Sequence, residues 1–417
     1  MNYKKALNII ENVKYGHSKD SYNFKRVLDL LELNIDKKKI IQIAGTNGKG
    51  SVGTFLSTML LEQGYNVLHF SSPHLERYEE RIKYNLLPIS EKMLIGNLES
   101  ILSKIKLEEF RSLNYFEVSF LLALQTFSML ETDYFIIETG IGGRYDITNV
   151  FDDNLLSIIT TIHFDHQDIL GSTLEEITFH KSGIIKENRK VVSFKHNEAV
   201  DKILIEQSKF KNAKLKFLDN NDYNIENMDL KGTKFSYGNF KLKTKVLGSY
   251  QVKNISLAIL ALFNILLDPN LKKIQSAVEK LYFEGRMEVV SEKPLIILDG
   301  AHNFEGIKSL EKNIYDLKLD NYNLILGSMK DKNVKDHLNS IIKRAKKIIL
   351  TKIDYERAMD PRDFLKVIDD FKGEKVIIDS VEETCNFIKN EIDKDEKVII
   401  TGSLYLIGEF KNKLKDE

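Results

Sequence analysis

Residues 40–51 read IIQIAGTNGKGS, and this stretch decides how the rest of the chain is interpreted. A β-branched run ends in a glycine-rich turn, and apolar residues at helical spacing follow at once, from Val52 to Leu60. A strand, turn and helix N-terminus of this kind form an anion cradle, because the turn N–H groups point at the ligand and the helix dipole favours negative charge. Lys49 can reach phosphate oxygens, and Ser51 offers a hydroxyl near a bound Mg²⁺.

The stretch matches the general phosphate-loop pattern imperfectly. That pattern requires glycine where Ile43 stands, and Ser or Thr directly after the lysine, where Gly50 stands. The alternative is a glycine-rich turn that binds nothing. Three glycines and a lysine within six residues favour nucleotide binding over that alternative.

The composition is that of a globular chain with balanced charge. Its 417 residues suggest two or three domains, at about 150 residues each. The 61 Lys and Arg residues equal the 61 Asp and Glu residues, so neither nucleic acid nor an anionic membrane is expected as a partner. The single cysteine, Cys385, excludes an internal disulfide.

The apolar runs of the chain are short. None approaches the roughly 18 residues of a membrane span, and the amphipathic N-terminal segment carries acid, unlike a signal peptide. No coiled-coil heptad is evident. We therefore expect a cytoplasmic protein that is a monomer.

Apolar runs alternate with helical patterns along most of the chain, which predicts an α/β fold with a mainly parallel central sheet covered on both faces. Residues 214–248 differ, because their alternation predicts a hairpin and a small antiparallel patch. Residues 283–286 (FEGR) mark the seam between two predicted domains, 1–286 and 287–417. The strands predicted beyond the opening stretch are 66–72, 133–139, 155–162, 190–194, 294–298, 321–326, 347–351, 375–378 and 397–401.

Polar clusters follow several of these strands, at the ends where ligands bind in such sheets. They are Ser71–His74, Glu138–Asp146 and His163–His166, beside the opening stretch itself. Oxygen and imidazole ligands around a triphosphate suit Mg²⁺, and the lack of thiolates makes Zn²⁺ the less favoured metal. Each cluster alone could be an ordinary ion pair, cap or exposed side chain, so the joint placement carries the prediction of a common site.

The chain resembles the folylpolyglutamate synthase/dihydrofolate synthase family of the Mur ligase superfamily. The family's phosphate loop has the same Gly-Lys-Gly-Ser variation, whereas its usual Pro-Gly-Arg is Glu284-Gly285-Arg286 here. The motifs that carry the resemblance are AGTNGKGS (44–51), SSPHLERYEERI (71–82), YFE (115–117), ETGIGGRYDITN (138–149), DH (165–166), HKSGI (180–184), EGRME (284–288), LDGAHN (298–303), GSMKDK (327–332) and TGSLYLIGEF (401–410).

The resemblance implies a Mur-ligase-like P-loop ATPase domain over 1–286 and a smaller Rossmann-like domain over 287–417. It also implies an ATP-dependent acid–amino acid ligase. The acceptor carboxylate attacks the γ-phosphate of ATP, and the amine of L-glutamate then displaces phosphate from the acyl phosphate. Dihydropteroate, folyl-(poly)glutamates or both would be the acceptor.

The resemblance further assigns roles to single residues. Lys49, Lys181 and His166 would be catalytic, and closing the two domains around ATP would exclude water. The expected ATP contacts are Thr46, Asn47, Gly48, Lys49, Gly50, Ser51, Asn254, Arg286 and Asp299.

Two Mg²⁺ sites and a substrate site are implied in the same way. Ser72 and Glu138 would hold one metal and His166 the second, with Ser51 an alternative ligand and Lys181 a ligand if it is carbamylated. The residues expected on the pteridine side are Tyr115, Phe116, Glu117, Tyr145, Asp146 and Ile147, and those expected on the glutamate side are His302 and Ser403.

Two alternatives to a folate ligase are open. One is another Mur-type ligase that acts on a different acid, and the other is a nucleotide-binding regulatory protein without turnover. Glu138, His166 and Lys181 discriminate against the second, because a binding module needs phosphate contacts but no second metal.

Overall fold

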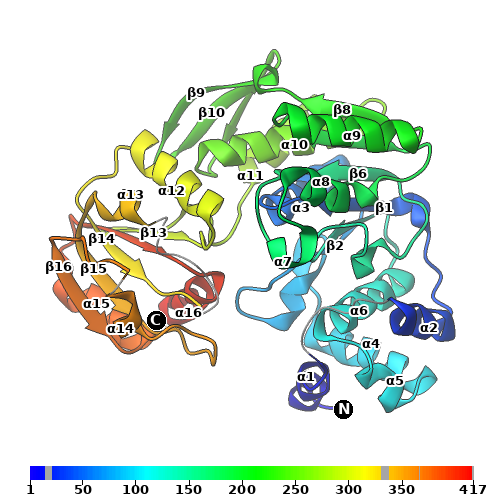
Figure 1. Cartoon of the computed structure of the whole chain (residues 1–417), viewed down its shortest axis with the longest axis horizontal. Coiled ribbons are helices and arrows are strands. Elements are labelled where there is room, and N and C mark those ends of the chain that lie inside the picture. Colours follow the sequence, from blue (N-terminus) through cyan, green and yellow to red (C-terminus); the bar gives the residue numbers. More distant parts are fainter. Residues whose placement is uncertain (15–20, 330–337, 366, 416–417) are drawn as a thin grey trace. The chain divides into compact units, whose positions relative to one another are not determined.

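The computed structural model describes residues 1–14, 21–329, 338–365 and 367–415 (Figure 1). Contacts divide the chain into two compact units, 1–223 with 253–278 and 224–252 with 279–417. The domain boundary expected after Arg286 stays a prediction. The packing itself changes unit after Val278 and assigns 224–252 to the second unit.

The first unit is built on a mainly parallel sheet of eight strands in the order β4-β3-β2-β5-β1-β6-β7-β8. The six strands β2-β5-β1-β6-β7-β8 pair in parallel with their neighbours. At the β2 edge, β3 and β4 extend the sheet in antiparallel fashion. Every residue of the central β1 is buried, as expected of a strand covered on both faces. The strands are β1 (Ile40–Ala44), β2 (Val67–Phe70), β3 (Ile82–Tyr84), β4 (Leu87–Pro88), β5 (Tyr134–Glu138), β6 (Leu156–Ile159), β7 (Lys190–Phe194) and β8 (Lys214–Leu218).

Helices cover both faces of this sheet (Figure 1). Leu68 and Phe70 of β2 share one face with Phe135 and Ile137 of β5, and they pack in one core with α1, α2, α4, α5 and α6. On the opposite face α3 lies against β2. The helices are α1 (Tyr3–Glu11), α2 (Tyr22–Leu31), α3 (Lys49–Gln63), α4 (Glu91–Lys104), α5 (Leu107–Arg111), α6 (Tyr115–Met129), α7 (Gln167–Leu170), α8 (Leu174–Lys181), α9 (Glu198–Phe210), α10 (Ser249–Ile265) and α11 (Leu271–Lys280).

The second unit contains an antiparallel patch and a six-stranded sheet. The patch is ordered β11-β10-β9, which confirms the hairpin predicted from the alternating residues, and the larger sheet is ordered β12-β13-β17-β14-β15-β16. The start of the region predicted as antiparallel is corrected, because residues 214–218 form β8, which pairs in parallel with β7 in the first unit. All neighbours in the larger sheet are parallel except β12 and β13. The strands are β9 (Tyr223–Asp229), β10 (Gly232–Tyr237), β11 (Phe240–Thr244), β12 (Glu288–Glu292), β13 (Leu295–Asp299), β14 (Tyr322–Leu326), β15 (Ala345–Thr351), β16 (Glu374–Ile378) and β17 (Lys397–Thr401).

Alternate residues of the six-stranded sheet enter two different cores. Ile297 of β13 packs in the core with α12, whereas its neighbours Ile296 and Leu298 pack in the core with α15 and α16. Both faces are therefore covered, as the Rossmann-like prediction required. The helices of this unit are α12 (Phe304–Asp316), α13 (Asn339–Ile342), α14 (Pro361–Phe364), α15 (Val381–Glu391) and α16 (Leu404–Lys415). The short 3-10 helices of the chain are η1 (Lys37–Lys39), η2 (Tyr78–Arg81), η3 (Ile147–Asn149), η4 (Ser182–Ile184) and η5 (Asn220–Asp222).

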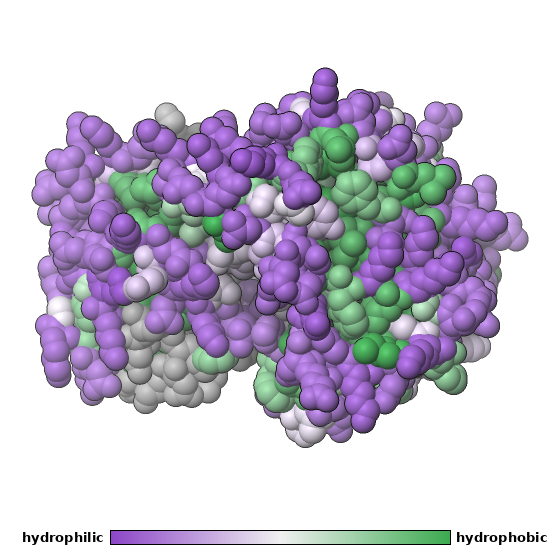
Figure 2. Space-filling view, turned by 90° about the horizontal axis from the view of Figure 1, so that it is seen from above, coloured by the Kyte–Doolittle hydropathy of each residue, from purple (hydrophilic) through white to green (hydrophobic). Residues whose placement is uncertain are grey.

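On the face drawn in Figure 2, hydrophilic residues predominate and hydrophobic ones are scattered between them. Among the described residues, no helix combines the length and the apolar character that crossing a membrane requires.

A buried histidine marks the contact between α3 and β2. His69 is 3% exposed, and in the described part of the chain its Nε2 has no hydrogen-bond partner. A Cβ at Gly53 would lie 2.4 Å from this Nε2, so the helix can approach the strand only because residue 53 is glycine. Burial, with the charge of Lys83, lowers the pKa of His69 to about 3.

This histidine should make folding weaken in acid. The unfolded chain binds a proton at His69 below about pH 6.5, and the folded chain does not until the pH approaches 3. Protonation of the unfolded chain therefore has no effect on stability above about pH 6.5, and as the pH falls it lowers the free energy of unfolding, by about 2 kcal/mol at pH 5. Urea unfolding at pH 5 and pH 7.5 measures it. His69→Leu should flatten the pH dependence by that amount, and an unchanged pH dependence in the variant would contradict the assignment.

Candidate functional site

The glycine-rich loop joins β1 to α3 as predicted. Gly48 is the N-cap of α3 with φ of 88°, and a Cβ there would lie 2.7 Å from Oδ1 of Asn254. Gly45 is more restricted still, because its Cβ would lie 1.8 Å from Oγ1 of Thr160. The loop therefore needs glycine at both positions, and it brings Asn254, a predicted nucleotide contact, beside its backbone.

Segment 160–163, after β6, holds the loop from the other side. Thr46 donates its backbone N–H to the Thr161 carbonyl at 2.6 Å, and the Asn47 N–H donates to Oγ1 of Thr161 at 3.2 Å. Oγ1 of Thr46 accepts the backbone N–H of His163 at 3.1 Å. The strand predicted over 155–162 ends at Ile159. Thr160 still donates its N–H to the carbonyl of Ala44, the last residue of β1, at 2.8 Å, whereas Thr161 bonds to the loop. Two adjacent threonines after an apolar run were the signal that could have identified these residues.

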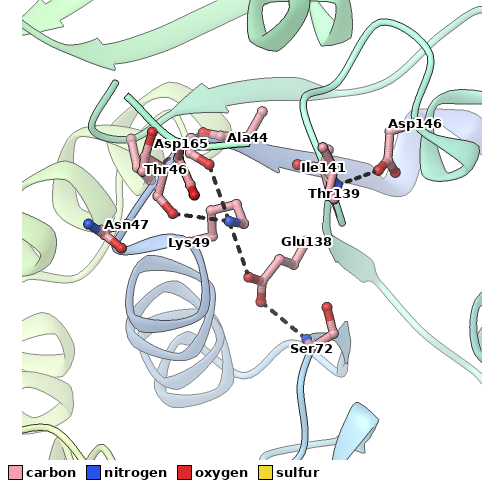
Figure 3. Close-up of polar contacts among 12 residues, drawn as sticks. Ala44, Thr46, Asn47, Lys49, Ser72, Glu138, Thr139, Ile141, Asp146 and Asp165 are labelled. Atoms are coloured by element: carbon pink, nitrogen blue, oxygen red, sulfur yellow. Dashed lines mark hydrogen bonds and ion pairs between the residues drawn. The ribbon is translucent and has the colours of Figure 1, made fainter. Parts of the chain in front are cut away.

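Lys49 points its ammonium back over the loop (Figure 3). Nζ donates to the carbonyls of Gly45 and Thr46 at 3.2 and 3.3 Å, and it lies 3.8 Å from Oε1 of Glu138. Glu138 ends β5, the parallel neighbour of β1. Its Oε2 accepts the backbone N–H of Ser72 at 3.4 Å. The structure thus brings the loop, Glu138 and Ser72 together from three neighbouring strand ends.

Lys181, at the end of α8, is buried beneath the same loop. It is 2% exposed, and its Nζ donates to the Gly45 carbonyl at 2.9 Å, the same oxygen that Lys49 contacts. Burial, helped by the positive charge of Lys49 and opposed by Asp165 and Asp146, lowers the pKa of Lys181 to about 7. At neutral pH, Lys181 is therefore an uncharged amine in a large fraction of the molecules.

His166 precedes α7 in the loop that follows β6. Its Nε2 lies 3.7 Å from Oδ2 of Asp165, and its backbone N–H donates to Oδ1 of the same carboxylate at 3.1 Å. The described residues include no group of three or more His, Cys, Asp or Glu that could hold a metal ion. The predicted ligands Ser72, Glu138 and His166 instead supply a hydroxyl, a carboxylate and an imidazole. This set fits Mg²⁺, which keeps waters and phosphate oxygens in its remaining positions. The alternative ligand Ser51 is buried within α3.

The predicted substrate residues at the start of α6 contact other protein residues in this structure. The carboxylate of Glu117 accepts the Asn114 N–H at 2.8 Å, and the Asn114 side chain accepts the Glu117 N–H at 2.9 Å, which forms a capping box. Glu117 thus caps the helix that carries Tyr115 and Phe116. The Phe116 ring packs 5.7 Å from the ring of Phe70.

The second glycine-rich turn, 140–146, is fixed by Asp146. Its carboxylate accepts the N–H of Ile141 at 2.8 Å (Figure 3). It also accepts the N–H of Thr148 at 3.0 Å. Burial raises the pKa of Asp146, against the effect of these hydrogen bonds. Ile147 is buried, whereas Tyr145 is 76% exposed with its ring 5.5 Å from that of His180. Tyr145 is therefore the residue of this turn that is open to a ligand.

In the second unit, Asp299 ends β13 beside the turn that carries Arg286. Its carboxylate accepts the Met287 N–H at 2.9 Å and the Ala301 N–H at 2.9 Å, and burial raises its pKa despite the charge of Arg286. Glu284 in place of the family's proline therefore does not prevent the turn.

The other predicted residues of this unit lie at helix starts and turns. Nδ1 of His302 is 2.8 Å from the Gly300 carbonyl, and Oγ of Ser403 accepts the Tyr405 N–H at 3.2 Å. Asn303 is the N-cap of α12, since its side chain accepts the Gly306 N–H at 2.8 Å. In the motif GSMKDK, residues 330–332 lie outside the described ranges.

Known proteins match both parts of the chain. The family described as Mur ligase middle domain matches residues 43–262, and the Mur ligase glutamate ligase domain matches residues 285–404. The dihydrofolate synthase/folylpolyglutamate synthase of Bacillus subtilis is 30% identical over 97% of this chain and 96% of its own length. These matches confirm the family predicted from the motifs.

Solved structures agree with the fold. The crystal structure of folylpolyglutamate synthase from Thermotoga maritima matches with a TM-score of 0.85 at 28% identity, covering 99% of this chain and 96% of that one. E. coli FolC in complex with DHPP and ADP has a TM-score of 0.87 at 24% identity, covering 100% and 98% of the two chains, and shares the fold. The chain belongs to the dihydrofolate synthase/folylpolyglutamate synthase family of the Mur ligases.

Proposed function

We propose that the protein is an ATP-dependent ligase that joins L-glutamate to a folate, to dihydropteroate or to both, with release of ADP and phosphate. One observation carries the proposal: the loop, Lys49, Glu138, Ser72 and the buried Lys181 lie together at neighbouring strand ends. The names of the relatives support the substrates, since the Bacillus subtilis protein is named for both activities and the E. coli structure contains ADP.

The chemistry requires charge neutralisation more than covalent catalysis. A carboxylate oxygen of the acceptor forms a bond to the γ-phosphorus of ATP, and ADP leaves. The glutamate amine then attacks the acyl carbon, so that an amide forms and phosphate and a proton are released. Lys49 and the N–H groups of residues 48–51 would bind the phosphates, with Thr46 and Asn47, whose own N–H groups bond to Thr161, as further proposed contacts. Asn254 would contact the nucleotide beside Gly48. In the second unit, Arg286 and Asp299 are the proposed ATP contacts.

Two Mg²⁺ ions are the proposed metals. Ser72 and Glu138 would hold one, with Ser51 as the alternative hydroxyl, and His166 would hold the other. Bound metal would neutralise phosphate oxygens. Lys181 would serve the second metal as a carbamate, because its low pKa favours the uncharged amine that adds CO₂, and the carbamate converts an ammonium into an oxygen ligand.

The acceptor would bind beside the second glycine-rich turn. A pteridine ring can stack on an aromatic side chain, and Tyr115, Phe116 and the exposed Tyr145 are the proposed rings, with Glu117, Asp146 and Ile147 around them. His302 and Ser403 are the proposed residues on the glutamate side. A monomer in the cytoplasm remains the proposed state of the protein.

A phosphate-release assay tests this function. We expect release only when ATP, Mg²⁺, glutamate and an acceptor are all present, with dihydropteroate and tetrahydrofolate offered in separate reactions. If neither dihydropteroate nor tetrahydrofolate supports release, the proposal that the acceptor is a folate or dihydropteroate is refuted. Nucleotide binding without any release would support the regulatory alternative instead.

A further inference from the structure

A buried lysine in the last helix has no role in the proposed chemistry. Lys411 of α16 is 5% exposed, and its Nζ lies 2.8 Å from Oε1 of Glu284 and 2.9 and 3.3 Å from the two carboxylate oxygens of Glu288. The Tyr282 hydroxyl is 3.4 Å away. Burial opposes the charge of Lys411, but the hydrogen bonds to both carboxylates hold its pKa above the ordinary value. The side chain is therefore a cation fixed between two acids.

Glu288 links Lys411 to the turn that carries Arg286, because its carboxylate bonds to both. Its Oε2 accepts the Gly285 N–H at 2.6 Å, directly before Arg286. Directly after it, the Met287 N–H donates to Asp299 at 2.9 Å. The two amides that flank Arg286 are thus each held by a buried carboxylate.

The backbone of this turn needs such support. Gly285 and Met287 have φ of 65° and 48°, and for Met287 the left-handed conformation costs about 1 kcal/mol or more. The Gly285 carbonyl also accepts the Gly300 N–H at 2.8 Å. Without Lys411, the buried carboxylate of Glu288 would lose its cation, and the turn would lose a fixed acceptor.

We propose that Lys411 is a positioning residue for Arg286, acting through Glu288 and the Gly285 N–H. The inference rests on the proposed function, in which Arg286 contacts ATP. Lys411 itself touches no substrate; it sets the direction in which the backbone presents the guanidinium.

Lys411→Met tests the proposal, with Lys413→Met as its matched control. Lys413 lies on the same helix, is partly exposed and pairs with Glu382 at 2.8 Å. We expect Lys411→Met to raise the KM for ATP about tenfold or more, with smaller changes in kcat and in the KM for the acceptor. The control variant should behave as the unaltered protein.

A double-mutant cycle separates positioning from general stability. If Lys411 acts through Arg286, the pair Lys411→Met with Arg286→Ala should have the same KM for ATP as Arg286→Ala alone. Multiplied effects would overturn the proposal, and so would a normal KM in Lys411→Met beside a defective Arg286→Ala. A normal KM for ATP in Arg286→Ala would overturn both the proposed ATP contact of Arg286 and the positioning role of Lys411. Should Lys411→Met not fold, Lys411→Arg keeps the charge with a planar group and enters the same cycle.

Discussion

Replacing Lys49 with alanine is expected to reduce ATP-dependent phosphate release by about 10³-fold or more. The ammonium lies at the N-terminus of α3, bonded to the carbonyls of Gly45 and Thr46 and 3.8 Å from Glu138. Under the proposed function, the ammonium would exchange these contacts, at 3.2 Å and longer, for phosphate oxygens. Among the described residues no other cation is seen to contact both loop carbonyls, so alanine would remove the charge proposed to neutralise the transferring phosphoryl group.

The matched control for this variant is Lys38→Ala. Lys38 is an exposed lysine of η1, just before β1, and its loss should leave phosphate release unchanged. Circular dichroism should verify that both variants are folded. Near-normal phosphate release by Lys49→Ala would contradict the proposal that residues 45–51 bind the phosphates of ATP.

Lys181→Ala is expected to lose activity by about 10²-fold or more, and small carboxylates such as acetate should restore part of it. The alanine leaves a cavity beside the Gly45 carbonyl, where Lys181 is now 2% exposed. A carboxylate in that cavity would supply the oxygens that a carbamate supplies. The measurement is phosphate release as a function of acetate concentration.

Lys186→Ala is the control for the rescue. Lys186 is also buried, and burial lowers its pKa to about 8, but it donates to Oδ1 of Asn149 and to the Phe151 carbonyl, away from the loop. Its variant should lose stability and gain nothing from acetate. Full activity of Lys181→Ala without any carboxylate would exclude Lys181 from the metal site. Lost activity that no carboxylate restores would mean that the amine itself is needed.

The architecture was predictable because its signals are local. β-Branched runs, glycine turns and helical spacing each act over a few residues, and the five apolar runs predicted after residue 287 became five strands of the six-stranded sheet, all but β12. The meeting of Ser72, Glu138 and the loop was predictable too, because the carboxyl ends of parallel strands lie along one edge.

Long-range pairing was not predictable. Lys411 is one of many lysines, and only the packing of α16 against Glu284 and Glu288 distinguishes it. The contact of Glu117 with substrate stays a prediction, and the capping box that its carboxylate forms with Asn114 is a local pattern, three residues apart. The division of the chain also depends on contacts, as residues 224–252 belong with strands that follow much later.

Gly53 can change in evolution only if His69 changes as well. Any side chain at residue 53 would collide with the imidazole, whose Nε2 lies where the Cβ would approach to 2.4 Å. A smaller residue at position 69 removes the collision, so a related chain with alanine at the first position should have lost the histidine at the second. Because α3 begins with Lys49, a side chain at residue 53 opposite an unchanged His69 would push the helix away from β2, and the glycine-rich loop would move with it.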